Sequence, residues 1–296
     1  MLIPLPTAEH FILTSDYLIM SEMKLFIDSA KLSEIEKAHS CGVLDGITTN
    51  PTLIKNAMED LKERGEALNI WEYTDRILMT SAGIPVILGV TESTCEGIAN
   101  QGSALYYLFN PVAGNVYIKV PVNPSFVGEI GRDFEGIKAI KTLSAAGIPV
   151  TATFIFTPEQ ALMAAKAGAK IVCLHAGKLD DYILVRHGIT VNATGCIPAG
   201  GLKSETGVID DDGIVSGVDL IKTTSALFKR YNLETQIMAA SIRSSRQARE
   251  VALAGADIAT LPLNLIESLM THPKTLEGME LFKQGVLQEY ADLTKK

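Results

Sequence analysis

Short blocks of apolar residues alternate along the chain with longer stretches in which apolar residues recur every three or four positions. The blocks are about four to eight residues long, which is typical of buried strands, and the longer stretches have the spacing of amphipathic helices. Some stretches are bounded by helix signals, such as Thr157-Pro158 at a start and Gly147 at an end. The pattern predicts eight strands, over residues 24–29, 45–51, 84–91, 116–120, 150–155, 170–175, 236–241 and 257–262.

Because helical stretches separate the predicted strands, consecutive strands are expected to lie parallel in one sheet. Eight such strand–helix units are typical of an α/β fold of the (β/α)8, or TIM barrel, type. An open doubly wound sheet is the alternative, but such a sheet usually carries a glycine-rich phosphate loop after its first strand, and this sequence has none there. We predict one barrel domain over residues 23–296, with two additional C-terminal helices at about 264–270 and 275–293.

Three stretches fall outside this pattern. Residues 1–22 are mildly apolar, and because Met20 and Met23 both precede the first clear strand, this segment is interpreted as an extension outside the core. Residues 182–217 contain seven glycines and an Asp-Asp-Asp run, and residues 123–136 form a second long connection. Long loops in compact domains are often functional, so both are expected to shape the site.

Composition narrows the possible partners. The chain has 296 residues, of which 47% are hydrophobic, and a net charge of −8 without a basic block, which argues against nucleic acid as a partner. No apolar run approaches the ~18–20 residues that span a membrane, so no membrane association is expected. The four cysteines are scattered, which predicts neither a zinc site nor disulfides and favours the cytoplasm.

One lysine lies inside an otherwise apolar predicted strand. Lys119 has apolar residues on both sides within the segment 117–122. A buried ammonium group is costly, so it either finds a partner or loses its proton, and a deprotonated lysine can condense with a carbonyl to form a Schiff base. The alternative is a lysine at a strand end whose ammonium group reaches solvent.

Other polar residues stand where the predicted strands end. The carboxyl ends of all strands of a (β/α)8 barrel meet at one face, where such enzymes hold their active sites. Taken singly, Asp28 is also explained as a helix cap, Asn50 as a turn residue and Ser241 as a cap. Together they favour imine chemistry, in which an acid moves protons and a hydroxyl group holds water. The candidates are Asp28, Thr48, Thr49, Asn50, Thr91, Lys119, Thr153, His175, Ser241 and Arg243.

Several of these strand ends resemble the motifs of the transaldolase family, in particular its small microbial branch that includes fructose-6-phosphate aldolases. The motifs are T-T-N-P at 48–51, K-V-P at 119–121, L-F-I-D-S at 25–29, A-A-S-I-R at 239–243 and T-L-P-L at 260–263. The resemblance implies a class I aldolase mechanism that uses neither a metal ion nor a cofactor. It also implies sugar phosphates as substrates.

By this resemblance, Lys119 would form the Schiff base, Asp28 would be the acid/base, and Thr153 would hold the catalytic water. The substrate would be bound by Thr49, Asn50, Lys178, Ser241 and Arg243. The implied reaction is transfer of a dihydroxyacetone unit from a ketose phosphate, such as fructose 6-phosphate, to an aldose phosphate, as in the pentose phosphate pathway. The alternatives are an aldolase that releases free dihydroxyacetone and a sugar-phosphate-binding barrel without turnover.

Three positions depart from the family's pattern. Gly89 stands where the family carries a Glu or Gln that helps to hold water, and Lys178 replaces a phosphate-binding Arg. His175 stands where transaldolases carry Phe and fructose-6-phosphate aldolases carry Tyr. Because histidine titrates near neutral pH, His175 is either a proton carrier for the three-carbon enamine, which favours aldolase activity, or a neutral, hydrogen-bonded residue of the wall.

The resemblance further implies a homo-oligomer, because small members of the family form rings in which a C-terminal helix packs on a neighbour. The stretch 276–293 has the amphipathic pattern for this role. The alternative is that its apolar face covers its own barrel.

Overall fold

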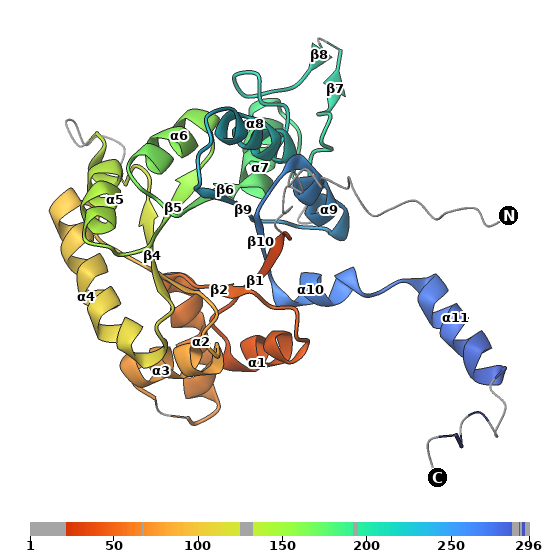
Figure 1. Ribbon diagram of the computed structural model, residues 1–296. Coiled ribbons are helices and arrows are strands. Elements are labelled where there is room, and N and C mark those ends of the chain that lie inside the picture. The colour runs from red at the N-terminus through yellow and green to blue at the C-terminus, as the bar shows by residue number, and fades with distance from the viewer. Residues whose placement is uncertain are drawn as a thin grey trace, which may run out of the picture.

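The computed structural model describes residues 22–66, 68–124, 133–191, 195–205, 207–285, 290, 292 and 293. Within them, eight parallel strands close into a barrel in the order β1-β10-β9-β6-β5-β4-β3-β2 (Figure 1). The predicted (β/α)8 barrel is therefore confirmed, whereas residues 1–21 of the extension proposed over 1–22 lie outside the described residues. The strands are β1 (Lys24–Asp28), β2 (Gly46–Thr48), β3 (Val86–Gly89), β4 (Val116–Pro121), β5 (Val150–Ile155), β6 (Ile171–His175), β9 (Gln236–Ala240) and β10 (Ile258–Leu261).

Helices surround the barrel because each crossover between parallel strands runs over the outer surface of the sheet (Figure 1). Several begin at a capping residue: Thr94, Thr157 and Ser244 each accept a hydrogen bond from a backbone N–H of the first turn. The helices are α1 (Leu32–Ser40), α2 (Pro51–Glu63), α3 (Ile70–Thr80), α4 (Cys95–Ala113), α5 (Glu135–Ala145), α6 (Pro158–Lys166), α7 (Ala176–Arg186), α8 (Gly217–Arg230), α9 (Ser245–Ala254), α10 (Leu263–Leu269) and α11 (Pro273–Gln284).

Side chains on the strands alternate between the barrel interior and the layer beneath the helices, as the two-residue period of a strand requires. Phe26, Ile87, Cys173 and Met238 form part of a buried cluster that fills the interior. The intervening residues, such as Leu88, belong to the larger core between strands and helices. A residue that shares the parity of the interior cluster therefore points toward the barrel axis, which decides which strand-end side chains reach the mouth.

The stretch between β2 and β3 forms two helices, α2 and α3, although apolar residues recur at helical spacing through it. The chain leaves α2 through Gly65, whose φ of +77° is a conformation that glycine adopts readily. It enters α3 at Asn69, whose side chain accepts a hydrogen bond from the backbone N–H of Glu72. A glycine and a capping box thus interrupt a hydrophobic period that otherwise continues.

The segment 182–217 differs from the prediction, because it is not a loop from its beginning. The helix α7 starts directly after β6 and reaches Arg186, and a small antiparallel hairpin of β7 (Lys203–Ser204) and β8 (Gly207–Val208) follows. No start signal precedes α7 in the sequence, since its N-cap, His175, makes no side-chain capping hydrogen bond. The barrel then continues with β9, which pairs directly with β6.

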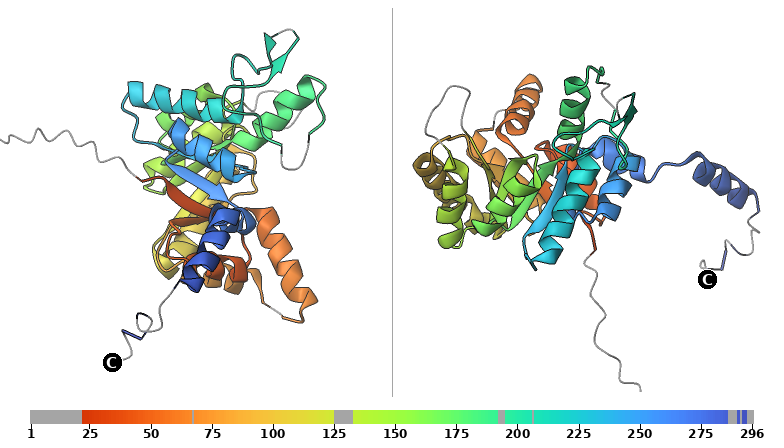
Figure 2. Two further views of the ribbon diagram at one scale, coloured as in Figure 1. Left: turned by 90° about the vertical axis from the view of Figure 1, so that its right-hand side faces the viewer. Right: turned by 90° about the horizontal axis from the view of Figure 1, so that it is seen from above.

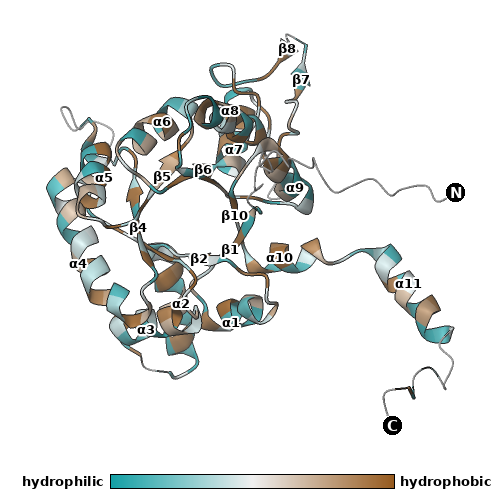
Figure 3. Ribbon diagram, in the orientation of Figure 1, coloured by the Kyte–Doolittle hydropathy of each residue, from teal (hydrophilic) through white to brown (hydrophobic). Residues whose placement is uncertain are grey.

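The last helix stands apart from the barrel. In the right-hand view of Figure 2, α11 extends away from the strands and their surrounding helices. None of its residues is buried, and Leu276, Met279 and Phe282 are exposed. The hydropathy colouring shows that apolar and polar segments alternate along this helix (Figure 3). Across the described part of the chain, no helix combines the length and hydrophobicity needed to cross a membrane.

Candidate active site

Lys119 points into the barrel near the carboxyl end of β4. In the sheet register it lies between Gly89 of β3 and Thr151 of β5. The residue is only 9% exposed, and it shares the inward parity of Tyr117, which packs against the interior cluster. The amine is thus held inside the barrel, among the polar strand ends.

Asp28 ends β1 and pairs in register with Thr48 of β2. The Thr48 hydroxyl donates to Asp28 Oδ1 (2.8 Å), and its oxygen lies 2.6 Å from Thr260 Oγ1. The neighbouring Thr49 is turned the other way: it is fully buried, and its hydroxyl donates to the backbone carbonyl of Ile87 (2.7 Å). Thr48 therefore lies beside the carboxylate, whereas the hydroxyl of Thr49, which is predicted to bind substrate, is engaged by the backbone of β3.

The rim above β2 and β3 is fixed by local hydrogen bonds. Asn50 caps α2, because its Oδ1 accepts from the backbone N–H of Leu53 (2.9 Å), and its separate amide NH2 group is a further donor. A Cβ atom added at Gly89 would lie 3.0 Å from Pro51 Cδ, which is closer than a comfortable contact. The Asn50-Pro51 turn thus occupies space that a larger side chain at position 89 would need.

The His175 ring lies within hydrogen-bond distance of two hydroxyl groups and stacks on two phenyl rings. Its Nε2 lies 3.0 Å from Thr153 Oγ1 and its Nδ1 lies 3.1 Å from Ser241 Oγ. The ring stacks on Phe154, with centroids 5.4 Å apart, and on Phe156, with centroids 5.8 Å apart. Three predicted site residues therefore meet in one hydrogen-bonded chain, in which the imidazole links two hydroxyl groups.

Burial changes the chemistry of this imidazole. Desolvation, together with the positive charges of Lys119 and Lys178, lowers the pKa of His175 to about 3. The expectation that His175 titrates near neutral pH is therefore wrong, because the ring is neutral at pH 7. A neutral imidazole still has one donor and one acceptor nitrogen, which match its two hydroxyl partners.

Cys173 lies two residues before His175 in β6, on the same side of the strand. Burial raises the pKa of this thiol, the charge of Lys119 opposes that rise, and the charge of Asp28 adds to it. A hydrogen bond from Thr153 also favours the thiolate. The lysine, the carboxylate and the threonine therefore all influence the ionisation of one buried thiol.

Arg243 lies beyond the end of β9, facing α7. Both terminal nitrogens of its guanidinium group donate to the two carboxylate oxygens of Asp181, and Nη1 also donates to the Gly195 carbonyl (3.1 Å). Lys178 stands nearby on the same helix, with its Nζ 5.4 Å from the centre of the Phe154 ring. Two cations thus border the mouth, and one of them is engaged by an internal carboxylate.

Asp180 lies in α7, the helix that also carries Lys178 and Asp181. It is fully buried and accepts hydrogen bonds from the backbone N–H groups of Gly217 (2.7 Å) and Ile197 (3.1 Å) and from Gln247 Nε2 (3.0 Å). Burial outweighs these bonds and raises the pKa of Asp180 to about 6. The carboxyl group ties α7 to the following loop, to α8 and to α9.

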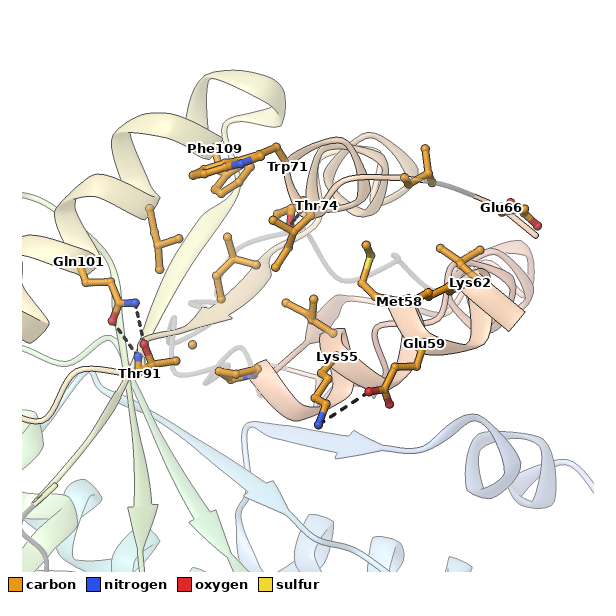
Figure 4. A pocket seen from close by; sticks show the side chains of 18 residues that line it. Lys55, Met58, Glu59, Lys62, Glu66, Trp71, Thr74, Thr91, Gln101 and Phe109 are labelled. Carbon is orange, nitrogen blue, oxygen red and sulfur yellow. Dashed lines mark hydrogen bonds and ion pairs between the residues drawn. The ribbon is translucent and has the colours of Figure 1, made fainter. Parts of the chain in front are cut away.

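A separate pocket of about 850 Å³ opens outside the barrel, between α2, α3 and α4 (Figure 4). Its walls are mostly apolar and include Met58, Trp71 and Phe109, with Lys55 and Glu59 at the edge. The pocket reaches the rim at Gly89, but it does not contain the lysine, the acid or the histidine of the barrel mouth.

Comparison with known proteins shows the family of the chain. The family model described as transaldolase/fructose-6-phosphate aldolase matches residues 25–295. The chain belongs to this family. Proteins named probable transaldolase from Exiguobacterium sibiricum and Aquifex aeolicus are each 35% identical to it over 260 residues, which cover 88% of this chain and 96% and 94% of theirs. A thiamine phosphate pyrophosphorylase from Pyrococcus furiosus matches in structure with a TM-score of 0.43 at 12% identity over 82% of this chain and 86% of its own, a likeness too remote to bear on function.

Within this transaldolase-family barrel, sequence reasoning missed four residues of the mouth. Thr260 and Cys173 could have been found from strand parity, because both share the inward positions of their strands. Asp181 follows the predicted Lys178 by three residues, so a helix beginning at β6 would have placed both on one face. The position of Phe154 beside His175 could not be predicted, because it depends on the register shift between β5 and β6, which no sequence pattern indicates.

Proposed function

We propose that this transaldolase-family protein transfers a dihydroxyacetone unit from a ketose phosphate, such as fructose 6-phosphate, to an aldose phosphate. The main support is the buried Lys119 at the mouth of the barrel, with Asp28, Thr153 and His175 around the same space. A lysine amine that faces polar groups inside a water-poor barrel is suited to attack a ketone and form an imine. The reaction fits the pentose phosphate pathway, and a cytoplasmic location follows from that assignment.

The proposed reaction proceeds by conventional imine chemistry. Lys119 Nζ attacks the ketone carbon and water leaves, which produces a protonated imine. Asp28 then accepts the proton of the hydroxyl group at the carbon–carbon bond to be broken, the aldehyde leaves, and the imine becomes an enamine. The enamine carbon then attacks the carbonyl carbon of the acceptor aldehyde, which reverses the cleavage steps and gives a new imine. A water molecule held by Thr153 hydrolyses this imine and releases the product. The hydrogen bond from Thr48 fixes the orientation of Asp28 for both proton transfers.

The phosphate end of the substrate is assigned to the cationic corner. Arg243, Lys178 and Ser241 lie around the end of β9 and the start of α7, beside the His175 ring. Asn50 is assigned to the substrate hydroxyls on the opposite side, where its amide NH2 group can donate. The Arg243 guanidinium group would exchange Asp181 for a phosphate, because both anions accept its paired donors.

Transfer is favoured over aldol cleavage by the state of the imidazole. Release of free dihydroxyacetone requires a proton on the enamine carbon, and a neutral His175 is a poor source of it. The aldolase remains the second candidate, because His175 stands where a phenol occurs in the aldolase branch. A binding protein without turnover is the third candidate, and Gly89 is the observation in its favour.

Two measurements test the proposal together. Fructose 6-phosphate is supplied with and without erythrose 4-phosphate, and free dihydroxyacetone, glyceraldehyde 3-phosphate and sedoheptulose 7-phosphate are followed. Sedoheptulose 7-phosphate that appears only with the acceptor supports the transferase, free dihydroxyacetone without it supports the aldolase, and no product in either reaction supports the binding protein. Borohydride should trap the sugar on Lys119, and Lys119→Met should abolish both trapping and turnover, whereas the control Lys178→Met should retain trapping.

We infer also that the protein forms a homo-oligomer through α11. The helix carries exposed Leu276, Met279 and Phe282 and buries none of its residues on its own barrel. A helix with such an apolar face gains stability only when another surface covers it. A neighbouring copy offers apolar surface, including the pocket between α2, α3 and α4.

A further inference from the structure

We propose that Phe154 is a positioning residue that keeps His175 from protonating the bound enamine, and that it thereby directs the enzyme toward transfer rather than release of dihydroxyacetone. The inference rests on the proposed function, since it concerns the fate of the same enamine. It begins from the shape of β5, where the regular pairing with β6 is interrupted.

The register between β5 and β6 shifts beside Phe154. Ala152 pairs with Val172, and the next recorded pair is Ile155 with Leu174, so Thr153 and Phe154 together oppose Cys173. Such a bulge inserts one extra residue and redirects a side chain. Two consecutive residues of one strand therefore reach the same ring: Thr153 by a hydrogen bond to Nε2, and Phe154 by stacking.

The backbone at Phe154 adopts a conformation that a bulky residue rarely takes. Its φ is +56°, in the left-handed region, and its side chain is 49% exposed. An exposed aromatic residue in a strained conformation stabilises little by its own burial, so its value lies in what it covers. It stacks on the His175 ring, as Phe156 also does.

The covered imidazole is kept from water and from an extra proton. The charges that act on it are the ammonium groups of Lys119 from β4 and Lys178 from α7, the latter held above the Phe154 ring. Its own strand contributes Cys173, and β5 and the end of β9 contribute only the hydroxyls of Thr153 and Ser241. In the free enzyme, a pKa of about 3 leaves the imidazolium form in about one molecule in 10⁴ at pH 7. In the enamine the Lys119 nitrogen is uncharged, so burial, the largest cause, and the charge of Lys178 keep the ring neutral.

Release of dihydroxyacetone needs that rare form. An imidazolium donates its proton to the enamine carbon, which regenerates an iminium, and water then adds and displaces the lysine amine to give the free ketone. Transfer does not use this proton, because the enamine carbon bonds to the acceptor aldehyde instead. Removing the Phe154 ring would hydrate His175, populate the imidazolium and open the releasing route.

The experiment compares the wild type with Phe154→Ala and Phe154→Asn, the second because Asn tolerates a left-handed φ. Phe154→Tyr is the matched control, since it keeps the ring. The ratio of free dihydroxyacetone to transfer product is measured, and His175 is titrated by NMR of protein labelled at the histidine ring carbon, with His175→Gln identifying its signal. We expect the Ala and Asn variants to raise the release ratio about tenfold and the pKa of His175 by more than one unit, and the Tyr variant to change neither.

An unchanged release ratio in both variants, or an unchanged pKa of His175, would overturn the role of Phe154 while leaving the transferase assignment intact. Absence of transfer product from the wild type would instead overturn the proposed function, and with it the claim that Phe154 favours transfer over release. The titration would then still show whether the ring shields the imidazole.

Discussion

Replacing His175 by Phe should change how the stability of the protein depends on pH. The folded protein holds this imidazole neutral, because burial lowers its pKa from 6.5 to about 3. Between these two pH values the unfolded chain binds a proton at His175 and the folded chain does not, so the free energy of unfolding falls as the pH falls. The contribution of the neutral ring is fully present above about pH 6.5 and is lost progressively toward pH 3.

The magnitude follows from the pKa values. At pH 4.5, two pH units below the unfolded value of 6.5, the loss is about 3 kcal/mol. Asp180 acts in the opposite sense, because its folded pKa is raised from 3.8 to about 6 and the folded state binds the extra proton in that interval. Its contribution is lost as the pH rises, by about 2 kcal/mol between pH 4.5 and 7.5. The two effects oppose each other in the wild type, so each is measured by comparison with a variant that lacks one of the two groups.

The assay is urea unfolding of the wild type and His175→Phe at pH 7.5 and 4.5, followed by circular dichroism. On moving to pH 4.5, the variant should gain about 3 kcal/mol relative to the wild type, because Phe cannot be protonated in the unfolded chain. Asp180→Asn is the companion variant, and it should lose about 2 kcal/mol relative to the wild type over the same change. Parallel pH profiles for the wild type and His175→Phe would refute the claim that the folded protein holds this imidazole neutral.

Three further changes probe other parts of the molecule. Asp181→Asn removes the carboxylate that engages Arg243, so the KM for fructose 6-phosphate should fall several-fold while activity on unphosphorylated fructose stays constant; equal effects on both substrates would contradict the assignment of this corner to phosphate. Gly89→Gln adds a Cβ that would lie 3.0 Å from Pro51 Cδ, so it should lower the free energy of unfolding by about 1–3 kcal/mol. An unchanged melting temperature would show that the Asn50-Pro51 turn moves aside without cost. Phe282→Glu places a charge on the apolar face of α11 and should reduce the oligomer mass in light scattering, whereas a mass equal to that of the wild type would remove α11 from the interface.

The barrel was predictable because its strands are buried on both faces and read as apolar runs of strand length. Lys119 and Asp28 were predictable for a related reason, since a charged residue stands out against such a run. Local signals did not reveal α7, because it starts at a strand-end histidine that makes no side-chain cap. Local signals also did not distinguish Thr48 from Thr49, because the direction in which each side chain points depends on the register of β2.

The environment of His175 depended still more on features that only the folded backbone reveals. Two of its contacts, Phe154 and Ser241, have left-handed φ values of +56° and +59°, each of which costs an L-residue about 1–2 kcal/mol. The surrounding packing must offset that cost, and Gly177 shows how: a Cβ there would lie 2.1 Å from the Ser241 carbonyl oxygen, so only glycine lets α7 approach. Two residues with strained backbones contact the His175 ring, and the close approach of Gly177 in α7 helps to hold one of them in place. Such strain is expected around a functional group rather than around a residue that only fills space. The same backbone geometry that holds His175 in place therefore keeps it buried and neutral, which supports the proposed transfer reaction.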